Sequence, residues 1–232
     1  MAIGYSKSPS ALEISDYYQK AKDSTSLHKK AMGGTDHNVA NSILRAVGWM
    51  GDPGPTLEIG AGEGLMTDVL VAGPCPITVV EPFADVDFSS KGAAYYRDID
   101  SIPESNRYDW ILMIEVIEHL DDPVGFLAKV GKRLTERGRL VVSTPNAAGP
   151  RARLQGQSWS EVQNITHLNL FSPLALRTAL TKAGFKQIER SRSPVAYKNS
   201  TMANAILGFT QLLGIDGGIR MTASNWQPTQ RS

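Results

Sequence analysis

The chain has 232 residues, of which 41% are hydrophobic and 20% charged, and its formal net charge is +1. This length suffices for one complete α/β domain, and the composition is that of an ordinary soluble globular protein. The near-neutral charge argues against a nucleic-acid duplex as partner. No apolar run approaches the ~18 residues of a membrane span, so we expect no membrane partner.

The cysteine content indicates the compartment. Cys75 is the single cysteine, so no intrachain disulfide can form and a reducing compartment is favoured. Residues 1–18 contain no apolar core long enough for a signal peptide. We therefore predict a cytoplasmic protein.

Residues 1–50 are predicted to form a helical cap or lid. One helix covers residues 11–22, and a second follows Asp36, a favourable N-cap residue, with apolar side chains at helical spacing through Val47. The Gly- and Pro-rich residues 51–55 end this layer in a turn.

From Thr56 onward, predicted strands alternate with predicted helices. The strands are residues 56–59, 77–81, 93–97, 110–114, 138–143, 185–192 and 219–223. The helices are residues 65–71, 123–134 and 173–183, the last capped by Ser172 and stopped by Gly184. This alternation indicates a doubly wound, mainly parallel α/β sheet of seven strands with helices on both faces.

No linker divides the chain, so we predict a single domain over residues 1–232. Residues 51–195 form its ligand-binding core. Residues 196–218 are predicted to carry an inserted helix, 199–213, that acts as a second lid.

The polar residues of interest follow the predicted strands. In an open doubly wound sheet the ligand lies at the carboxyl ends of the strands. Those ends carry Gly60–Gly64, Glu81–Pro82, Asp98–Ile99, Glu115–His119 and Thr144–Asn146. The candidate chemistry therefore falls on one edge of the sheet.

The glycine turn after the first strand indicates the kind of ligand. Gly60, Gly62 and Gly64 let a backbone approach a ligand closely. A dinucleotide site needs its third glycine one residue later, where this chain has Leu65. Glu58 just before the turn would repel a phosphate, so a cationic ligand is the natural counterpart. The structural alternative is a turn that only connects strand and helix.

This turn resembles the acid-x-Gly-x-Gly-x-Gly signature of class I S-adenosylmethionine-dependent methyltransferases. The resemblance, closest to the ubiquinone-pathway O-methyltransferases, continues in order through residues 108–123, 138–146 and 167–185. It implies a Rossmann-like fold and S-adenosylmethionine as cofactor. The cofactor-binding residues that it implies are Glu58, Gly60, Ala61, Gly62, Gly64, Glu81, Pro82, Asp98, Ile99, Glu115 and Val116.

Two of these acids have defined expected roles. Glu81 lies about 20 residues beyond the turn, where a carboxylate can accept hydrogen bonds from ribose hydroxyls. This spacing is shared with nicotinamide-binding folds and does not discriminate. By resemblance, the Asp98 carboxylate takes the adenine amine and the backbone amide of Ile99 meets a ring nitrogen. The alternative for Asp98 is a solvated acidic turn.

Glu115, Glu118 and His119 lie within one predicted helical turn, so the two carboxylates are expected to share a face. Our first interpretation is that His119 is a general base or substrate contact, with Glu118 and His167 as the other catalytic candidates. The second is that Glu118 and His119 only orient the loop.

A divalent metal is the third interpretation and the least favoured. Its candidate ligands are Glu115, Glu118, His119 and His167. The small-RNA 3′-end 2′-O-methyltransferases resemble this segment and bind such a metal. They carry a further histidine where this chain has residues 168–170 without one.

The resemblance implies methyl transfer to a small-molecule hydroxyl, on a secondary metabolite, quinone precursor or sugar. Residues 150–163, read as a loop with Arg151, Arg153, Gln155 and Trp159, would hold a carboxylate, phosphate or sugar, or simply be solvated. The alternatives are an RNA or tRNA methyltransferase, an N-methyltransferase, and a non-catalytic or NAD-binding Rossmann-like protein. The oligomeric state is not predicted.

Overall fold

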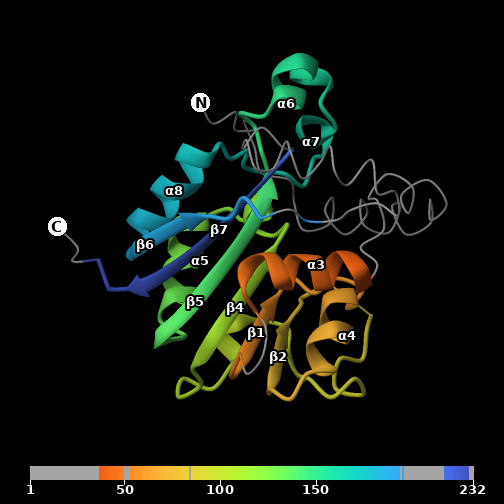
Figure 1. Ribbon diagram of the computed structural model, residues 1–232, viewed down its shortest axis with the longest axis vertical. Coiled ribbons are helices and arrows are strands. Elements are labelled where there is room, and N and C mark those ends of the chain that lie inside the picture. Colours follow the sequence, from red (N-terminus) through yellow and green to blue (C-terminus); the bar gives the residue numbers. More distant parts are fainter. Residues whose placement is uncertain (1–36, 50–52, 84, 194, 196–216, 230–232) are drawn as a thin grey trace.

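The computed structural model describes residues 37–49, 53–83, 85–193, 195 and 217–229 (Figure 1). The predicted helices over 11–22 and 199–213 and the predicted N-cap Asp36 lie outside the described residues. The helices are α3 (His37–Val47), α4 (Leu65–Val71), α5 (Pro123–Gly131), α6 (Pro150–Gln155), α7 (Ser160–Gln163) and α8 (Pro173–Lys182), with short 3-10 turns η1 (Ile99–Ser101), η2 (Ile117–His119) and η3 (Gly156–Ser158). The strands are β1 (Thr56–Ile59), β2 (Ile77–Val80), β3 (Ala94–Tyr96), β4 (Tyr108–Ile114), β5 (Leu134–Pro145), β6 (Phe185–Arg190) and β7 (Gly218–Trp226).

The seven strands form one sheet in the order β3-β2-β1-β4-β5-β7-β6. Strands β1 to β5 pair in parallel, and β7 runs antiparallel to both β5 and β6. The predicted Rossmann-like, doubly wound sheet is therefore confirmed. The strand order reverses between β1 and β4, which places the ligand crevice at the carboxyl ends of these two neighbours.

Helices cover both faces of this sheet (Figure 1). Helices α3 and α4 pack on one face, over a buried cluster that includes Trp110 and Leu112 of β4. Helices α5 and α8 pack on the other, over a cluster that includes Ile111 and Met113. Alternate residues of one strand thus build two cores, as the two-residue period of a strand requires.

Local signals set the ends of the helices. The Ser172 side chain accepts a hydrogen bond from the backbone N–H of Ala175 at 3.1 Å, which confirms the predicted cap of α8. Asp122 caps α5 in the same way. The prediction that α5 continues to Leu134 is wrong, because Leu134 already pairs with Tyr108 as the first residue of β5.

Residues 150–163 differ from the predicted loop. They form α6, η3 and α7, and Pro150 occupies the first turn of α6, where its missing N–H costs nothing. The last strand, expected over 219–223, is confirmed and longer, and its residues Ile219, Met221 and Ala223 are buried. Among the described residues, no helix is long and apolar enough to cross a membrane.

Candidate functional site

The glycine turn between β1 and α4 lies at the point where the strand order reverses. Gly60 has φ of +77°, and a Cβ there would lie 2.3 Å from Cγ2 of Val116. Glycine is therefore required at this position, both for the backbone angle and for the approach of the η2 segment. A Cβ on Gly62 would meet nothing within 4 Å, so the outer side of the turn is open to a ligand.

Glu81, at the end of β2, holds this turn in place. Its Oε2 accepts a hydrogen bond from the Gly62 backbone N–H at 2.8 Å, and its Oε1 accepts one from the N–H of Phe83 at 2.8 Å. Each carboxylate oxygen has a second lone pair, so a ribose hydroxyl could bind there as well. The carboxylate that is predicted to bind the ribose therefore also stabilises the glycine turn by hydrogen bonding.

Glu58 lies beneath the turn. It is buried, and its Oε2 accepts a hydrogen bond from the Thr67 hydroxyl of α4 at 2.6 Å. Burial raises the pKa of the Glu58 carboxyl to about 7, and the Thr67 hydrogen bond opposes that rise. The contact that the structure shows for Glu58 is structural, and its predicted contact with a cofactor stays a prediction.

The end of β3 presents Asp98 at the same edge of the sheet. Asp98 is exposed, and its Oδ1 accepts a hydrogen bond from the Asp100 backbone N–H at 2.8 Å. The Ile99 side chain is buried in the core, so only its backbone can face a ligand. Pro82 is exposed, and so is Phe83, at 63%, an aromatic surface that the sequence reasoning did not single out.

The charges around the turn match a cationic cofactor. Lys91 is near Gly64, but it forms an ion pair with Asp68 at 2.5 Å. The carboxylates at the strand ends therefore give this edge of the sheet a negative charge, which disfavours binding of a pyrophosphate. The open space beside Gly62 and this acidic edge fit S-adenosylmethionine, whose sulfonium and ammonium groups are both positive.

Glu115 directly follows β4 and lines a pocket. It has φ of +55°, a strained conformation for a residue with a side chain. Its Oε1 accepts a hydrogen bond from the Ser143 hydroxyl at 2.6 Å, and limited hydration raises its pKa. The pocket has a volume of ≈ 270 Å³, and its walls include Ile43, Arg151 and Glu161.

Glu118 lies in η2 and is 1% exposed. Its Oε2 accepts a hydrogen bond from the Thr144 hydroxyl at 3.0 Å. Burial, and then the charge of Glu115, raise the pKa of the Glu118 carboxyl well above its usual range. The prediction that Glu115, Glu118 and His119 lie in one helical turn is wrong, because Glu115 precedes the 3-10 turn, but the Glu115 and Glu118 carboxyls do lie next to each other. The left-handed backbone at Glu115 ends the strand before the 3-10 turn begins.

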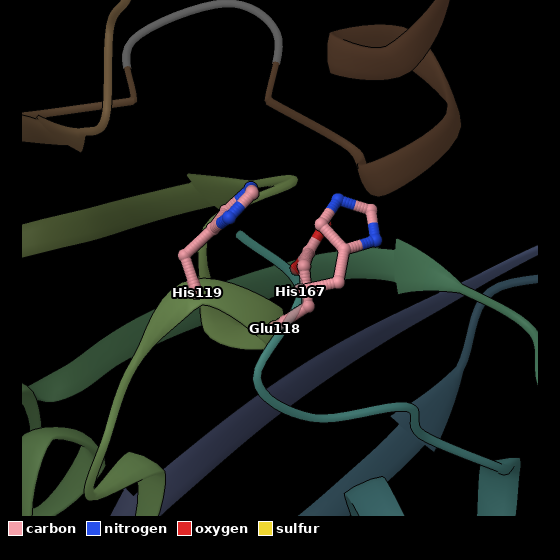
Figure 2. A group of neighbouring side chains, drawn as sticks. All are labelled: Glu118, His119 and His167. Carbon is pink, nitrogen blue, oxygen red and sulfur yellow. The ribbon is translucent and has the colours of Figure 1, made fainter. Parts of the chain in front are cut away.

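His119 and His167 meet beside Glu118 (Figure 2). Their rings pack edge to face, with centroids 4.7 Å apart. His119 Nδ1 lies 2.9 Å from the carbonyl oxygen of Thr166, and His167 Nδ1 lies 3.4 Å from Oε2 of Glu161. Burial lowers the pKa of both imidazoles, that of His167 to about 4, so both rings are neutral near pH 7.

The three predicted catalytic residues thus form one cluster. One possible ligand atom from each of Glu118, His119 and His167 lies within 4.8 Å of the others. Glu115 lines the pocket and is bonded to Ser143, and its carboxyl also interacts with that of Glu118, so it adjoins the cluster. Glu161 belongs to both sites, because it lines the pocket and neighbours His167.

Of the residues that hold this cluster, the sequence placed only Thr144 on the ligand-binding edge, without a role, and it singled out neither Thr166 nor Glu161. Thr144 and Thr166 are buried, and Glu161 lies in the segment that was read as a loop. Thr144 was the one with a signal, since it follows a predicted strand on the ligand-binding edge. Thr166 contributes only a backbone carbonyl to His119, and no side-chain pattern reports such a contact.

Residues 34–190 match the family described as "Methyltransferase domain". The chain belongs to this methyltransferase family. The fold and the acidic glycine turn agree with this family, and solved structures of S-adenosylmethionine-dependent methyltransferases share the fold.

Two curated relatives are similar over part of their length. A ubiquinone biosynthesis O-methyltransferase from Azorhizobium caulinodans is 31% identical over 105 residues, which is 39% of this chain and 40% of that protein. A mitochondrial ubiquinone biosynthesis O-methyltransferase from Candida albicans is 28% identical over 108 residues, 39% of this chain and 32% of that protein. The similarity therefore spans less than half of these relatives.

Solved structures share the fold of this methyltransferase. A Thermotoga maritima methyltransferase, described as a possible histamine N-methyltransferase, has a TM-score of 0.61 at 17% identity, over 91% of this chain and 97% of that one. An N-methyltransferase from Haemonchus contortus, in complex with S-adenosylhomocysteine and phosphomonomethylethanolamine, has a TM-score of 0.58 at 16% identity, over 82% of this chain and 53% of that one.

Proposed function

We propose that this methyltransferase transfers the methyl group of S-adenosylmethionine to a hydroxyl oxygen of a small-molecule acceptor, such as a quinone precursor, a sugar or another secondary metabolite. The observation that carries the proposal is the Glu118–His119–His167 cluster beside a pocket of ≈ 270 Å³. This volume suits a small molecule. The partial similarity to two ubiquinone biosynthesis O-methyltransferases supports an oxygen acceptor.

The residues proposed to hold the cofactor follow β1 to β4. Gly60, Ala61, Gly62 and Gly64 form the turn against which it lies, and Glu58 supports this turn from below. The others are Glu81 and Pro82 for the ribose, Asp98 and Ile99 for the adenine, and Glu115 and Val116 at the end of β4. When bound, the cofactor supplies an electrophilic methyl group on a sulfonium.

The catalytic cluster is proposed to release the proton of the acceptor hydroxyl. In the simplest form, the Thr166 carbonyl holds the proton on His119 Nδ1 and leaves Nε2 as a base. The acceptor oxygen then forms its bond to the methyl carbon as the carbon–sulfur bond breaks, and the hydroxyl proton goes to Nε2. The walls of the pocket align the acceptor and exclude water.

An amine acceptor is the second candidate. Glu115 and Glu161 place two carboxylates in the same pocket, and Arg151 is the one basic residue among its described lining residues. Two acids and one base would bind a protonated amine.

The test is a panel of phenols, sugars and amines of matched size, assayed with S-adenosylmethionine for release of S-adenosylhomocysteine. Turnover of a hydroxylated acceptor with retained cofactor binding supports the proposal. We expect His119→Asn to lower kcat by about 10² or more while calorimetric affinity for S-adenosylhomocysteine is unchanged. Turnover of amines alone would replace the first candidate by the second, and unchanged kcat in H119N would remove His119 from the chemistry.

A further inference from the structure

Arg220 of β7 is a buried cation without an ionic partner. It is 7% exposed, and its Nη2 donates a hydrogen bond to the Ser193 carbonyl oxygen at 2.9 Å. Among the residues that the structure describes, its buried Nε has no hydrogen-bond partner and no carboxylate forms an ion pair with its guanidinium. A guanidinium has five N–H donors, so the Ser193 carbonyl satisfies only part of this side chain. A buried charge in this state is costly, and an anion beside it would offset that cost.

The register of the sheet places Arg220 next to the pocket at the end of β4. Arg220 pairs with Ser143 of β5 and follows Gly218 by two residues, and both Ser143 and Gly218 line that pocket. Paired residues, and residues two apart in a strand, point to the same face of a sheet. Ile219 and Met221, on either side of Arg220, belong to the core under α5 and α8. The Arg220 side chain therefore lies on the opposite face, together with the pocket.

Two glycines leave space between Arg220 and the pocket. A Cβ on Gly217 would meet nothing within 4 Å among the described residues, and a Cβ on Gly218 would meet only the Thr144 carbonyl oxygen, at 3.9 Å. Gly218 does not have a positive φ, so its backbone would accept a side chain. The glycine at this position therefore serves space and not backbone conformation, and a small ligand in the pocket can extend along β7 to the guanidinium.

We propose that Arg220 binds an anionic group, a carboxylate or a phosphate, of the methyl acceptor. This choice of substrate class rests on the proposed function, because it takes the pocket to hold the acceptor. A guanidinium can donate two parallel hydrogen bonds to two oxygens of either anion, which fixes orientation as well as affinity. The anion site is separate from the catalytic cluster, because Arg220 lies in β7 whereas Glu118 and His119 lie in η2.

The charges across the pocket are then complementary to a molecule with two different ends. Glu115, Ser143 and Arg220 lie on the neighbouring strands β4, β5 and β7 or directly after them, and the Glu115 backbone N–H donates to the Ser143 carbonyl at 3.0 Å. Strands lie about 4.8 Å apart, so roughly 10 Å separates the backbones of Glu115 and Arg220. The carboxylates of Glu115 and Glu161 accept hydrogen bonds from hydroxyl or ammonium groups and repel an acid. We therefore expect small hydroxy acids or amino acids as acceptors.

The test is calorimetric titration of the full-length chain, in complex with S-adenosylhomocysteine, with benzoate, phenyl phosphate and the neutral benzamide. We expect at least one of the two anions to bind about 10-fold or more tightly than benzamide. Arg220→Gln should weaken binding of that anion by about 10-fold to 10²-fold and leave the affinity for benzamide unchanged. Arg177→Gln is the matched control, because Arg177 is exposed on α8, which covers the other face of the sheet.

Gly218→Val tests the same site with the guanidinium intact. Valine is favoured in strands, and its side chain would fill the space between Arg220 and the pocket. We expect binding of the anion to weaken by about 10-fold or more. Arg151→Gln tests the arginine of the pocket wall, which is exposed and donates a hydrogen bond to Gln155. Loss of the anion preference in R151Q but not in R220Q would assign the anion to Arg151 and contradict the proposal.

Unchanged affinity for S-adenosylhomocysteine shows that each variant is folded. A purely structural tie between Arg220 and Ser193 would lower the stability of R220Q without changing the ratio of anion to benzamide affinity. Absence of an anion preference in the wild-type chain, or a preference as strong in R220Q as in R177Q, would overturn the anion site.

Turnover separates this inference from the proposed function. Methylation of a hydroxybenzamide as efficiently as of the matching hydroxybenzoate would count against the anion site and leave the proposed function intact. An anion preference that R220Q removes, without turnover of any hydroxylated or amino acceptor, would support the anion site and count against the proposed function.

Discussion

Glu58 shows how one buried carboxyl links the glycine turn to pH. Its pKa is about 7 against an ordinary value of 4.5, because burial disfavours its charged form. The folded chain therefore holds this proton more tightly than the unfolded chain. Between these two pH values the unfolded state loses its proton first, so the free energy of unfolding falls as pH rises and then levels off.

We expect the wild-type chain to lose on the order of 3 kcal/mol across that window relative to E58Q, which has no such proton. Urea unfolding of both chains from about pH 5 to about pH 8 measures the difference. Thr67→Val removes the hydrogen bond that lowers the Glu58 pKa, so its pH-dependent loss of stability should begin at the same pH and extend to higher pH. Parallel pH profiles for the wild-type and E58Q chains would contradict the raised pKa.

At the scale of the elements, Trp226 joins the antiparallel end of the sheet to two helices. Its Nε1 donates a hydrogen bond to the Ala183 carbonyl at the end of α8, at 2.7 Å. Its ring lies against the last residue of α5, where a Cβ on Gly131 would be 2.2 Å from Cδ1. The edge pair β6 and β7 is thereby fixed to the helices that cover this face.

Gly131→Ala should destabilise the chain by about 1–3 kcal/mol, since the indole is also held by its hydrogen bond and cannot move freely. Trp226→Leu removes that obstacle, at a similar cost from lost packing and hydrogen bonding. The destabilisation of the double variant should be smaller, by at least about 1 kcal/mol, than the sum of the destabilisations of the two single variants. Urea unfolding of the four chains gives the coupling, and simple additivity would show that the indole does not limit this position.

The elements also show which sequence signals are sufficient. Helix α8 was predictable because its cap, its proline and its stop lie within the segment itself. Helices α6 and α7 were not, because six and four residues are too few to show a period. The β5–β7 pairing joins residues far apart in the chain, and only the tertiary structure sets its register.

The candidate site shows the same difference between features with a local sequence signal and features without one. The glycine turn and Glu81 were singled out from their spacing and Asp98 from the family resemblance, and βαβ units bring all three strand ends to one edge. The tie between His119 and Thr166 crosses 47 residues, and that between Glu118 and Thr144 crosses 26. No local sequence pattern encodes these contacts. The order of strands and helices therefore predicted where the candidate catalytic residues lie, but not which residues hold their side chains in position.

At the scale of the molecule, different strands of the sheet position the proposed cofactor site and the catalytic cluster. Most residues proposed for the cofactor follow β1 to β3, and Glu115 and Val116 follow β4. Glu118 and His119 of the catalytic cluster also follow β4, and Thr144, which holds Glu118, lies in β5. The turn and the cluster meet where Val116 packs against Gly60. This contact is through carbon atoms, so we expect the two sites to bind their ligands independently.

Glu81→Gln tests this separation. Glutamine has one acceptor oxygen, so one of the N–H groups of Gly62 and Phe83 would face its NH₂ group, a loss of about 1–3 kcal/mol. We expect affinity for S-adenosylhomocysteine to fall by about 10-fold to 10²-fold, while kcat at saturating S-adenosylmethionine is unchanged. Glu63→Gln, the same change at an exposed acid of the same turn, is the control and should alter neither. A parallel loss of kcat at saturating S-adenosylmethionine in E81Q would show that the turn supports the cluster, and that the two halves of the sheet act as one site.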